Sequence, residues 1–293
     1  MSTFFECRFV VMADSRSEDE GKNEKIIRQI MAQLVQIYPP PNYIVFQGDL
    51  IMGSKKPKRV KEQLEYFKEV IKEYFSIEIF LPTVGNHDVS SIAKDITKEK
   101  IFAEVFSEFK ADDFLDEYNR TAYYVDISNT RLIVLNSYHP GESKQISGQQ
   151  FEWFEKVSSE PRQHKIVFLH SPAYPTGHHI DSSLNIYPEK RDQFWNVIDK
   201  NNVNLVFTGH EHNYSRRLID ASFSTANYQF VRAVNQIVTG GAGGPLSNTY
   251  EDKQGVIVPP IPVFHYVLVD VYGEHLNVAA VSLEGNVIDQ FTI

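Results

Sequence analysis

Five short apolar segments of this sequence each end in a side chain that can bind a metal ion. They are Phe9–Ala13 before Asp14, Tyr43–Gly48 before Asp49, Ile79–Gly85 before Asn86, Lys165–Leu169 before His170, and Leu205–Gly209 before His210 and His212. Imidazole mixed with carboxylate and amide oxygen suits zinc, manganese or iron better than calcium. Pairs of cations about 3.5–4 Å apart are the usual arrangement for displacement at phosphorus.

A pair of cations needs an anionic ligand that both can share. Asp49 is the natural candidate, because its carboxylate has two oxygens. Asp14 and His212 would then complete one ion. Asn86, His170 and His210 would surround the other.

The segments before these side chains have the character of buried strands. They are rich in Val, Ile and Phe and are bounded by Gly or Pro, which is typical of strands buried on both faces. Ligands of such sheets collect outside the carboxyl ends of the strands. We therefore expect the six side chains to converge on one edge of one sheet. The chain after His212 has few helical segments, which suggests a second, mostly antiparallel sheet.

The whole chain, residues 1–293, is expected to form one α/β domain, because no linker is long enough to divide it. Two sheets would pack as a sandwich between helices, and the stretch at about residues 90–119 would be mostly helical. A net charge of −9 argues against binding to nucleic-acid polymers. A single cysteine, no apolar leader and no membrane-length apolar run favour a cytoplasmic protein without membrane contact. No feature indicates an oligomeric state.

The order of these motifs resembles that of the calcineurin-like metallophosphoesterases. The blocks that carry the resemblance are Ala13-Asp14, Gly48-Asp49, Gly85-Asn86-His87-Asp88, His170-Ser171-Pro172 and Gly209-His210-Glu211-His212. Within that family the chain is most similar to the purple acid phosphatase branch, through His170-Ser171-Pro172-Ala173-Tyr174 followed by His178-His179. The resemblance implies a four-layer α-β-β-α sandwich of two mixed β-sheets flanked by helices, with the metal site at the C-terminal ends of the strands.

The resemblance also implies hydrolysis of a small phosphate monoester by attack of a metal-bound hydroxide, with two divalent ions (Mn, Fe or Zn) as cofactors. His87 follows Asn86, so it can contact a phosphoryl oxygen or protonate the leaving alkoxide without binding a metal. His178 and His179 are similar to the substrate-side histidine pair of the purple branch and are rival acids.

Two departures from the family pattern affect the first metal position. The usual Asp-x-His block is Asp14-Ser15-Arg16 here, and an arginine has no lone pair to offer a metal. The first ion is therefore expected to bind weakly, and we hypothesise that Arg16 binds the substrate phosphate instead. Met52 stands where the purple branch has a tyrosine, so a colourless or faintly coloured protein is expected.

Two other functions stay open on the sequence alone. A phosphodiesterase acting on cyclic nucleotides or related diesters would use the same ligands. A catalytically weak protein-binding module is the other, favoured by the missing histidine at Arg16. The basic run Lys55–Lys61 fits either a solvated helix start or a surface that attracts anionic substrates.

Overall fold

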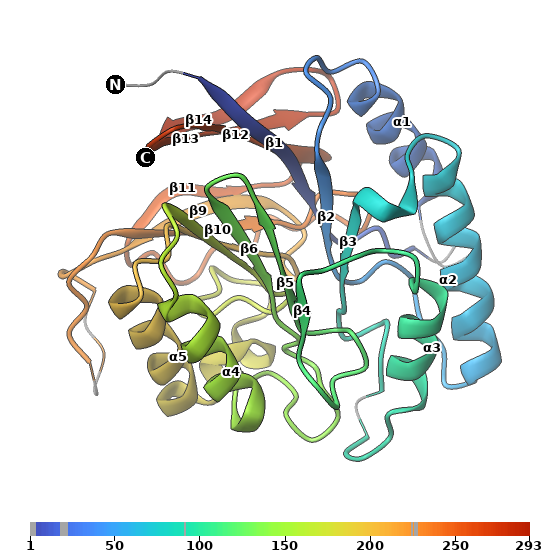
Figure 1. Cartoon of the computed structure of the whole chain (residues 1–293), viewed down its shortest axis with the longest axis horizontal. Helices are drawn as coiled ribbons and strands as arrows, with labels where there is room; N and C mark the ends of the chain where they lie inside the picture. The colour runs from blue at the N-terminus through green and yellow to red at the C-terminus, as the bar shows by residue number, and fades with distance from the viewer. Residues whose placement is uncertain (1–3, 18–22, 91, 224, 226–227) are drawn as a thin grey trace.

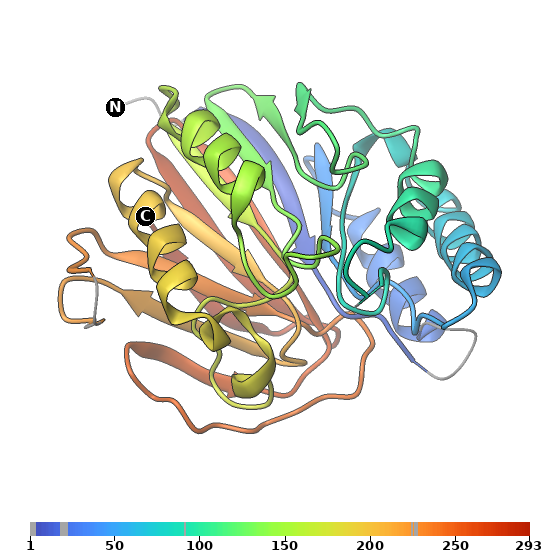
Figure 2. The same ribbon diagram turned by 90° about the horizontal axis from the view of Figure 1, so that it is seen from below.

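A computed structural model describes residues 4–17, 23–90, 92–223, 225 and 228–293 of the chain. Two β-sheets stack face to face, with helices on both outer sides (Figures 1 and 2). This is the expected four-layer sandwich of two mixed sheets. None of the helices in the described ranges is long and apolar enough to cross a membrane.

The first sheet has six strands in the order β14-β13-β12-β1-β2-β3. Strands β1 to β3 run parallel to one another, whereas β12 to β14 are antiparallel to their neighbours. The strand bounds are β1 Phe5–Met12, β2 Tyr43–Gln47, β3 Phe80–Thr83, β12 His265–Tyr272, β13 His275–Ser282 and β14 Val287–Thr292.

The second sheet has eight strands in the order β11-β9-β10-β8-β7-β6-β5-β4. Its central strands β6, β7, β8 and β10 are parallel, and the outer strands are antiparallel. The strand bounds are β4 Asp113–Phe114, β5 Tyr123–Ile127, β6 Thr130–Val134, β7 His164–Phe168, β8 Leu205–Thr208, β9 Tyr214–Ile219, β10 Val234–Thr239 and β11 Val256–Ile261.

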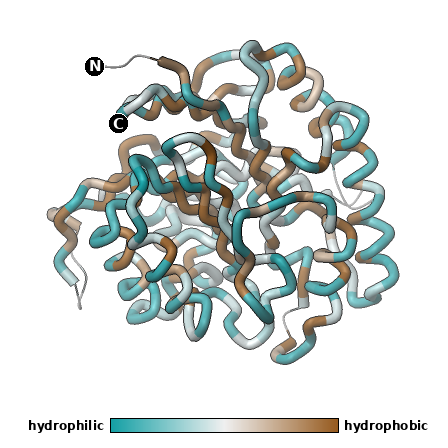
Figure 3. The backbone as a smooth tube through the Cα atoms, viewed as in Figure 1, coloured by the Kyte–Doolittle hydropathy of each residue, from teal (hydrophilic) through white to brown (hydrophobic). Residues whose placement is uncertain are grey.

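In the part of the chain that the structure describes, five α-helices cover the outer faces of the two sheets. They are α1 Glu24–Leu34, α2 Pro57–Lys72, α3 Thr97–Val105, α4 Gly148–Ser159 and α5 Pro188–Lys200, with short 3-10 helices at Ile77–Ile79, Ile180–Ser182 and Leu184–Ile186. Helices α1 and α2 lie beside the first sheet, and α4 and α5 cover the second (Figure 1). The strands in the middle of the molecule are its most hydrophobic segments (Figure 3).

Alternate residues of β7 show why both faces of this strand are apolar. Ile166 and Phe168 belong to the core between the sheets, where Phe168 packs edge-on against Phe9 of β1 at 6.1 Å between ring centroids. Val167 points the other way, into a second core with Phe154 of α4 and Trp195 of α5. A strand buried on both faces reads as a continuous apolar run, which is the pattern that the sequence displays.

The expectation that all six metal-binding candidates lie on one sheet is wrong. Strands β1 to β3 belong to the first sheet, whereas β7 and β8 belong to the second. The C-terminal strands are also not a separate sheet, since β12 to β14 extend the first sheet from β1 and β10 joins the second. A buried apolar strand carries no mark of which sheet it joins, and this is why the sequence pattern misassigned these strands.

The stretch at about residues 90–119 is less helical than expected. Helix α3 covers Thr97–Val105, and β4 follows at Asp113–Phe114; Ser91 lies outside the described residues. Phe109, which lies in this stretch but outside α3, packs on Tyr123 of β5 with 4.8 Å between the ring centroids. Its apolar spacing reflects an aromatic cluster rather than a continuous helix.

Candidate metal centre

The loops after four parallel strands bring five candidate ligands together from both sheets. Asp14 and Asp49 follow β1 and β2, whereas His170, His210 and His212 follow β7 and β8. Ligand atoms of Asp49, His170 and His210 lie within 4.8 Å of one another, and so do those of Asp14, Asp49 and His212. Asp49 thus belongs to both groups, as its two carboxylate oxygens allow.

Three of these residues adopt a backbone conformation that side chains usually avoid. Asp14, Asp49 and His210 have φ values of 64°, 52° and 70°. The left-handed region is unfavourable by about 1–2 kcal/mol for a residue with a Cβ. The turn after each strand therefore holds its ligand in a strained conformation, a feature that clusters at functional sites.

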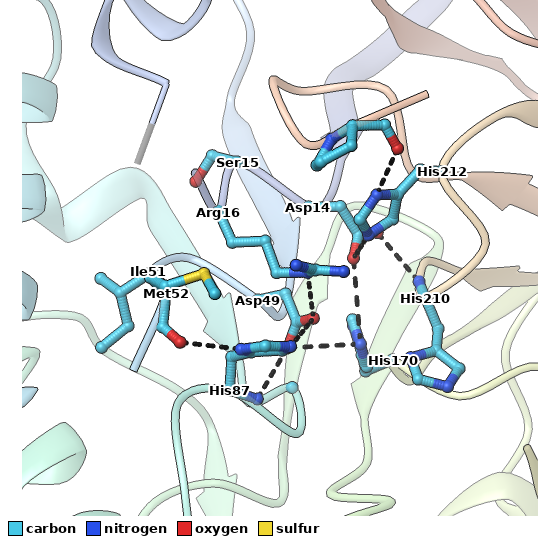
Figure 4. A network of polar contacts seen from close by, with 12 residues as sticks. Asp14, Ser15, Arg16, Asp49, Ile51, Met52, His87, His170, His210 and His212 are labelled. Carbon is cyan, nitrogen blue, oxygen red and sulfur yellow. Dashed lines mark hydrogen bonds and ion pairs between the residues drawn. The ribbon is translucent and has the colours of Figure 1, made fainter. Parts of the chain in front are cut away.

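Backbone carbonyl oxygens fix the orientation of three imidazoles. The Nδ1 atoms of His87, His170 and His212 lie 2.7 Å from the carbonyl oxygens of Met52, Gln47 and Pro245. A carbonyl oxygen can only accept, so each Nδ1 carries the hydrogen and donates it. The Nε2 atom of each ring is left facing the centre (Figure 4), and this is how metal-binding histidines are commonly held.

His210 is oriented the other way round. Its Nε2 lies 3.3 Å from Ser182 Oγ and 3.5 Å from the Tyr138 hydroxyl. Nδ1 is therefore the ring nitrogen that remains for Asp49 and His170. The backbone N–H of His210 donates to Asp14 Oδ2 at 2.9 Å, which joins the two sheets at this point.

Four candidate ligand atoms are buried without a hydrogen-bond partner among the described residues: Asp14 Oδ1, Asn86 Oδ1, His170 Nε2 and His212 Nε2. Buried polar atoms are nearly always paired, since leaving one unpaired costs about 1–3 kcal/mol. Two carboxylates, an amide oxygen and imidazole nitrogens are a donor set that suits divalent transition metals. These residues fit a pair of divalent cations.

The charges of the centre depend on one another. Burial opposes ionisation of Asp49, but the nearby His170, His87 and His210 outweigh it and lower the pKa of Asp49 below its usual range. Burial likewise opposes charge on His170, and the Asp49 and Asp14 carboxylates overcome this and raise the pKa of His170 to about 9. Burial and His170 lower the pKa of His210 well below its usual value. The carboxylates therefore attract positive charge into a buried space.

Arg16 points into this space rather than toward solvent (Figure 4). Its Nε lies 3.5 Å from Asp49 Oδ2, and its side chain is only 19% exposed. The guanidinium thus stands beside the shared carboxylate, on the side of the group that contains Asp14 and His212.

His87 lies at the border of the centre. Its Nε2 is 3.9 Å from Asp49 Oδ2, and its backbone N–H donates to Asp49 Oδ1 at 2.9 Å. The buried Asp88 next to it accepts from the backbone N–H groups of Leu50 and Gly85 at 3.1 and 2.8 Å. Asp88 thereby ties together the loops that carry Asp49 and His87.

Of the two predicted substrate-side histidines, one reaches the centre. His179 stacks on His210, with 3.8 Å between ring centroids and 22° between the planes. Its Nδ1 lies 3.0 Å from Ser182 Oγ. His178 is exposed and contacts the edge of His179 at 4.5 Å. Burial and the neighbouring His178 lower the pKa of His179 to about 4.

The sequence reasoning missed the role of Glu211, which stands between His210 and His212. Its carboxylate is buried and accepts from the backbone N–H groups of Thr176 and Gly177, both at 2.7 Å, and from Thr176 Oγ1 at 2.9 Å. Glu211 therefore fixes the start of the loop that carries His179. The only signal in the sequence was an acidic residue between two metal-binding histidines.

The glycine-rich segment Gly240–Gly244 passes close to the centre. A Cβ on Gly240 would lie 2.8 Å from Asp14 Oδ2, and one on Gly244 would lie 2.9 Å from His212 Nδ1. Side chains at these positions would displace the ligands. The backbone of this segment therefore passes close to Asp14 and His212.

Sequence comparisons identify the family of the chain. The model of the calcineurin-like phosphoesterase family matches residues 7–214. The human serine/threonine-protein phosphatase CPPED1 is 26% identical over 208 residues, which are 66% of this chain and 61% of that protein. Purple acid phosphatase 1 of Ipomoea batatas is 23% identical over 193 residues, 63% of this chain and 39% of that protein. The chain thus matches less than two thirds of the length of these relatives.

Structural comparison gives the same fold. Purple acid phosphatase PPD1 from yellow lupin (Lupinus luteus) superimposes with a TM-score of 0.78 and 16% sequence identity. The match covers 99% of this chain and 54% of that one. With the family model matched across all five metal-binding loops up to residue 214, this chain belongs to the calcineurin-like phosphoesterase family.

Proposed function

We propose that this protein is a metal-dependent phosphoesterase that hydrolyses small phosphate monoesters. The observation that carries the proposal is the position of Asp49, which is shared by two groups of buried ligand atoms. Asp14 and His212 would hold one divalent ion; Asn86, His170 and His210 would hold the other. Ions bound there would activate water and neutralise charge on a phosphoryl group.

Arg16 and His87 supply the groups that act directly on the substrate. The Arg16 guanidinium, beside Asp49, presents donors that match the oxygens of a phosphate. His87 donates its Nδ1 hydrogen to Met52 O, so Nε2 is the ring nitrogen that faces the substrate. In the imidazolium form, the proton on Nε2 can pass to the leaving oxygen.

His179 has a different role in this proposal. With a pKa of about 4 its imidazole is neutral at pH 7, so it is a poor proton donor to a leaving group. A neutral ring still hydrogen-bonds a phosphoryl oxygen. We therefore assign His179, with His178 beside it, to substrate binding and assign the acid role to His87.

Metal reconstitution and two substrates test the proposal. Chelator-treated protein is reloaded with Mn²⁺, Zn²⁺ or Fe²⁺ and assayed on p-nitrophenyl phosphate and bis-p-nitrophenyl phosphate. Turnover that needs metal and favours the monoester supports the proposal. A preference for the diester would instead support a phosphodiesterase. Because the human relative is named a serine/threonine-protein phosphatase, phosphoserine peptides belong in the same assay.

The role of Arg16 needs its own test. Arg16→Ala should raise the KM for p-nitrophenyl phosphate and lower kcat/KM by about 10²-fold, because a charge-assisted donor to the phosphoryl group is lost. Arg16→Lys is the matched variant, which keeps the charge and loses the planar pair of donors. Unchanged KM and kcat in Arg16→Ala would exclude Arg16 from the reaction.

The position of Arg16 also favours a second candidate function. A guanidinium 3.5 Å from the shared carboxylate can satisfy Asp49 without any ion, as a protein-binding module with this fold would require. Metal analysis of the purified protein separates the two functions. Protein that holds no metal and turns over none of these esters would support the binding module.

A further inference from the structure

A cavity adjoins the metal centre on the side of His87. It has a volume of about 520 Å³, and Asn86 and His87 are among the residues that line it. Cavities of this size hold small organic molecules. Since His87 is the proposed proton donor to the leaving oxygen, this cavity lies where the leaving group of a bound ester would extend.

The charges that line the cavity differ from those of the protein as a whole. Lys55 and Lys98 both border it, and Asp95 is the acidic residue of the lining. Neither lysine forms an ion pair within 4.0 Å among the described residues. The Asp95 carboxylate is occupied, because its Oδ1 accepts from the backbone N–H of Thr97 at 3.2 Å. Asp95 also interacts electrostatically with Lys98. A protein with a net charge of −9 thus presents two ammonium groups and one carboxylate at this cavity.

The helices around the cavity add to this positive potential. Lys55 precedes α2, and Lys98 lies in the first turn of α3. Neither helix has a side-chain hydrogen bond at its N-cap. Lys61 of α2 contacts Glu104 near the end of α3, and Lys68 contacts Glu108 beyond that end, so the two helices run in the same direction. Their N-termini, which carry partial positive charge, therefore both face the cavity side.

The remaining wall of the cavity is apolar. Met52, Val89 and Ile92 line it, and Ile92 is 66% exposed although it is a large apolar residue. A leaving group with a short carbon body can cover these side chains. An anionic group at its far end can then reach the lysines.

We propose that this cavity binds the leaving group of the substrate and selects phosphate monoesters that carry a second anionic group, either a carboxylate or a second phosphate. The inference rests on the proposed phosphatase activity and deepens it by naming the substrate class. The two lysines act on specificity and take no part in the proton transfer assigned to His87. Their contribution is the attraction between exposed opposite charges, which salt screens.

Three synthetic esters of similar shape test the proposal on the metal-loaded full chain. They are 4-carboxyphenyl phosphate, its neutral analogue 4-carbamoylphenyl phosphate, and 1,4-phenylene bisphosphate. The measured quantity is the ratio of kcat/KM for each anionic ester to that for the neutral amide. Comparing this ratio between variants cancels the different leaving abilities of the phenols. The bisphosphate arm shows whether carboxylate or phosphate is preferred.

Lys55→Gln and Lys98→Gln should each lower the ratio by about twofold to fivefold, and the double variant by about tenfold. Lys58→Gln is the matched control, since that side chain is 91% exposed on α2 and does not line the cavity; it should leave every rate constant unchanged. Raising the salt concentration should lower the ratio for the wild type and less for the double variant.

The outcomes separate this inference from the proposed function. A ratio that the double variant leaves at the wild-type value overturns the inference, while turnover of the esters still supports the phosphatase. No turnover of any of the three esters by the metal-loaded wild type overturns the proposed function itself, and the inference with it.

Discussion

The two halves of the metal centre share one carboxylate but are built differently. The half with His170 and His210 is the one in which we expect Asn86 as a further ligand, whereas the half with Asp14 and His212 has Arg16 where the family pattern has a histidine. A guanidinium is a permanent cation fixed to the chain, and a metal ion is an exchangeable one. In the half with Arg16, the negative charge of Asp49 is balanced by a side chain of the protein. In the half with His170 and His210, a metal ion taken up from solution would balance it. The half with His170 and His210 should therefore bind its ion more tightly than the half with Asp14 and His212.

Removing the shared ligand should have the largest effect. Asp49→Ala should lower kcat/KM on p-nitrophenyl phosphate by at least about 10³-fold, because neither ion keeps its bridging ligand. Metal analysis of the variant should show the loss of both ions. Retention of one tightly bound ion would mean that the two halves are independent of Asp49.

Restoring the family histidine should make the two halves more alike. Arg16→His adds an imidazole ligand and removes a cation. The affinity of the half with Asp14 and His212 for Zn²⁺ should therefore rise by about tenfold or more. Calorimetric titration of the metal-free protein measures this, with wild type expected to show one tight and one weak site. Arg16→Gln is the control, since it removes the charge without adding an imidazole. Equal affinities in all three proteins would contradict the comparison.

Glu211 lies between His210 and His212 in the sequence, but its carboxylate is hydrogen-bonded to Thr176 and Gly177, so its substitution should affect neither ion directly. Glu211→Gln exchanges one acceptor oxygen for an amide group that meets a backbone N–H, so the loop carrying His179 is held less firmly. We expect kcat to fall by about tenfold on a phosphate monoester while both metal affinities stay unchanged. Glu155→Gln, on the exposed side of α4, is the matched control. Loss of metal together with activity would assign Glu211 to the ligand cage instead.

The number of protons released when a metal ion binds should also depend on the half that it enters, and this is the smallest of the expected effects. In the metal-free protein His170, with a pKa of about 9, is protonated at pH 7, whereas the pKa of His210 is lowered and its ring is neutral. An ion that binds to His170 and His210 must displace the proton of His170. About one proton should therefore be released per ion at pH 7, and fewer as the pH rises through 9. Titrations in buffers of different ionisation enthalpy count these protons. Constant release between pH 7 and 10 would contradict the raised pKa.

The same raised pKa has a consequence for the stability of the metal-free protein. A histidine whose pKa is higher in the folded state stabilises it fully below the unfolded value of about 6.5. That contribution is lost as the pH rises through about 9. Chemical denaturation of the chelated protein should therefore show weaker stability at pH 9.5 than at pH 6.5. The His170→Asn variant should show a smaller difference.

Strand ends and their ligands were predictable because both signals are local. An apolar run followed by Asp14 or His170 carries its own information, whatever its neighbours are. The sheet to which each run belongs depends on pairing between distant segments, such as β1 with β12. Nothing in Leu205–Thr208 marks β8 as a strand of the second sheet. Five of the predicted ligands, Asp14, Asp49, His170, His210 and His212, lie close together, but they come from two sheets and not from one.

The parts of the site that the sequence did not reveal are those that depend on loop geometry. Tyr138, after β6, and Ser182, at the end of the 3-10 helix Ile180–Ser182, both reach His210, and neither is part of a motif. The sequence led only to the hypothesis that Arg16 binds the substrate phosphate; its distance of 3.5 Å from Asp49 depends on the geometry of the loop after β1. His179 was identified by resemblance, but its low pKa follows from burial beside His178 and is visible only in three dimensions.

The origin of the ligands from two sheets has a consequence beyond the reaction. Each layer of the sandwich supplies only part of either cage, so a cation can be held only after the two layers have docked. Bound ions would then cross-link the two sheets. The midpoint of thermal unfolding should rise with the concentration of free metal ion. Addition of a chelator should make the protein more susceptible to proteolysis. Metal limitation would therefore lower the stability of the folded protein as well as its proposed activity.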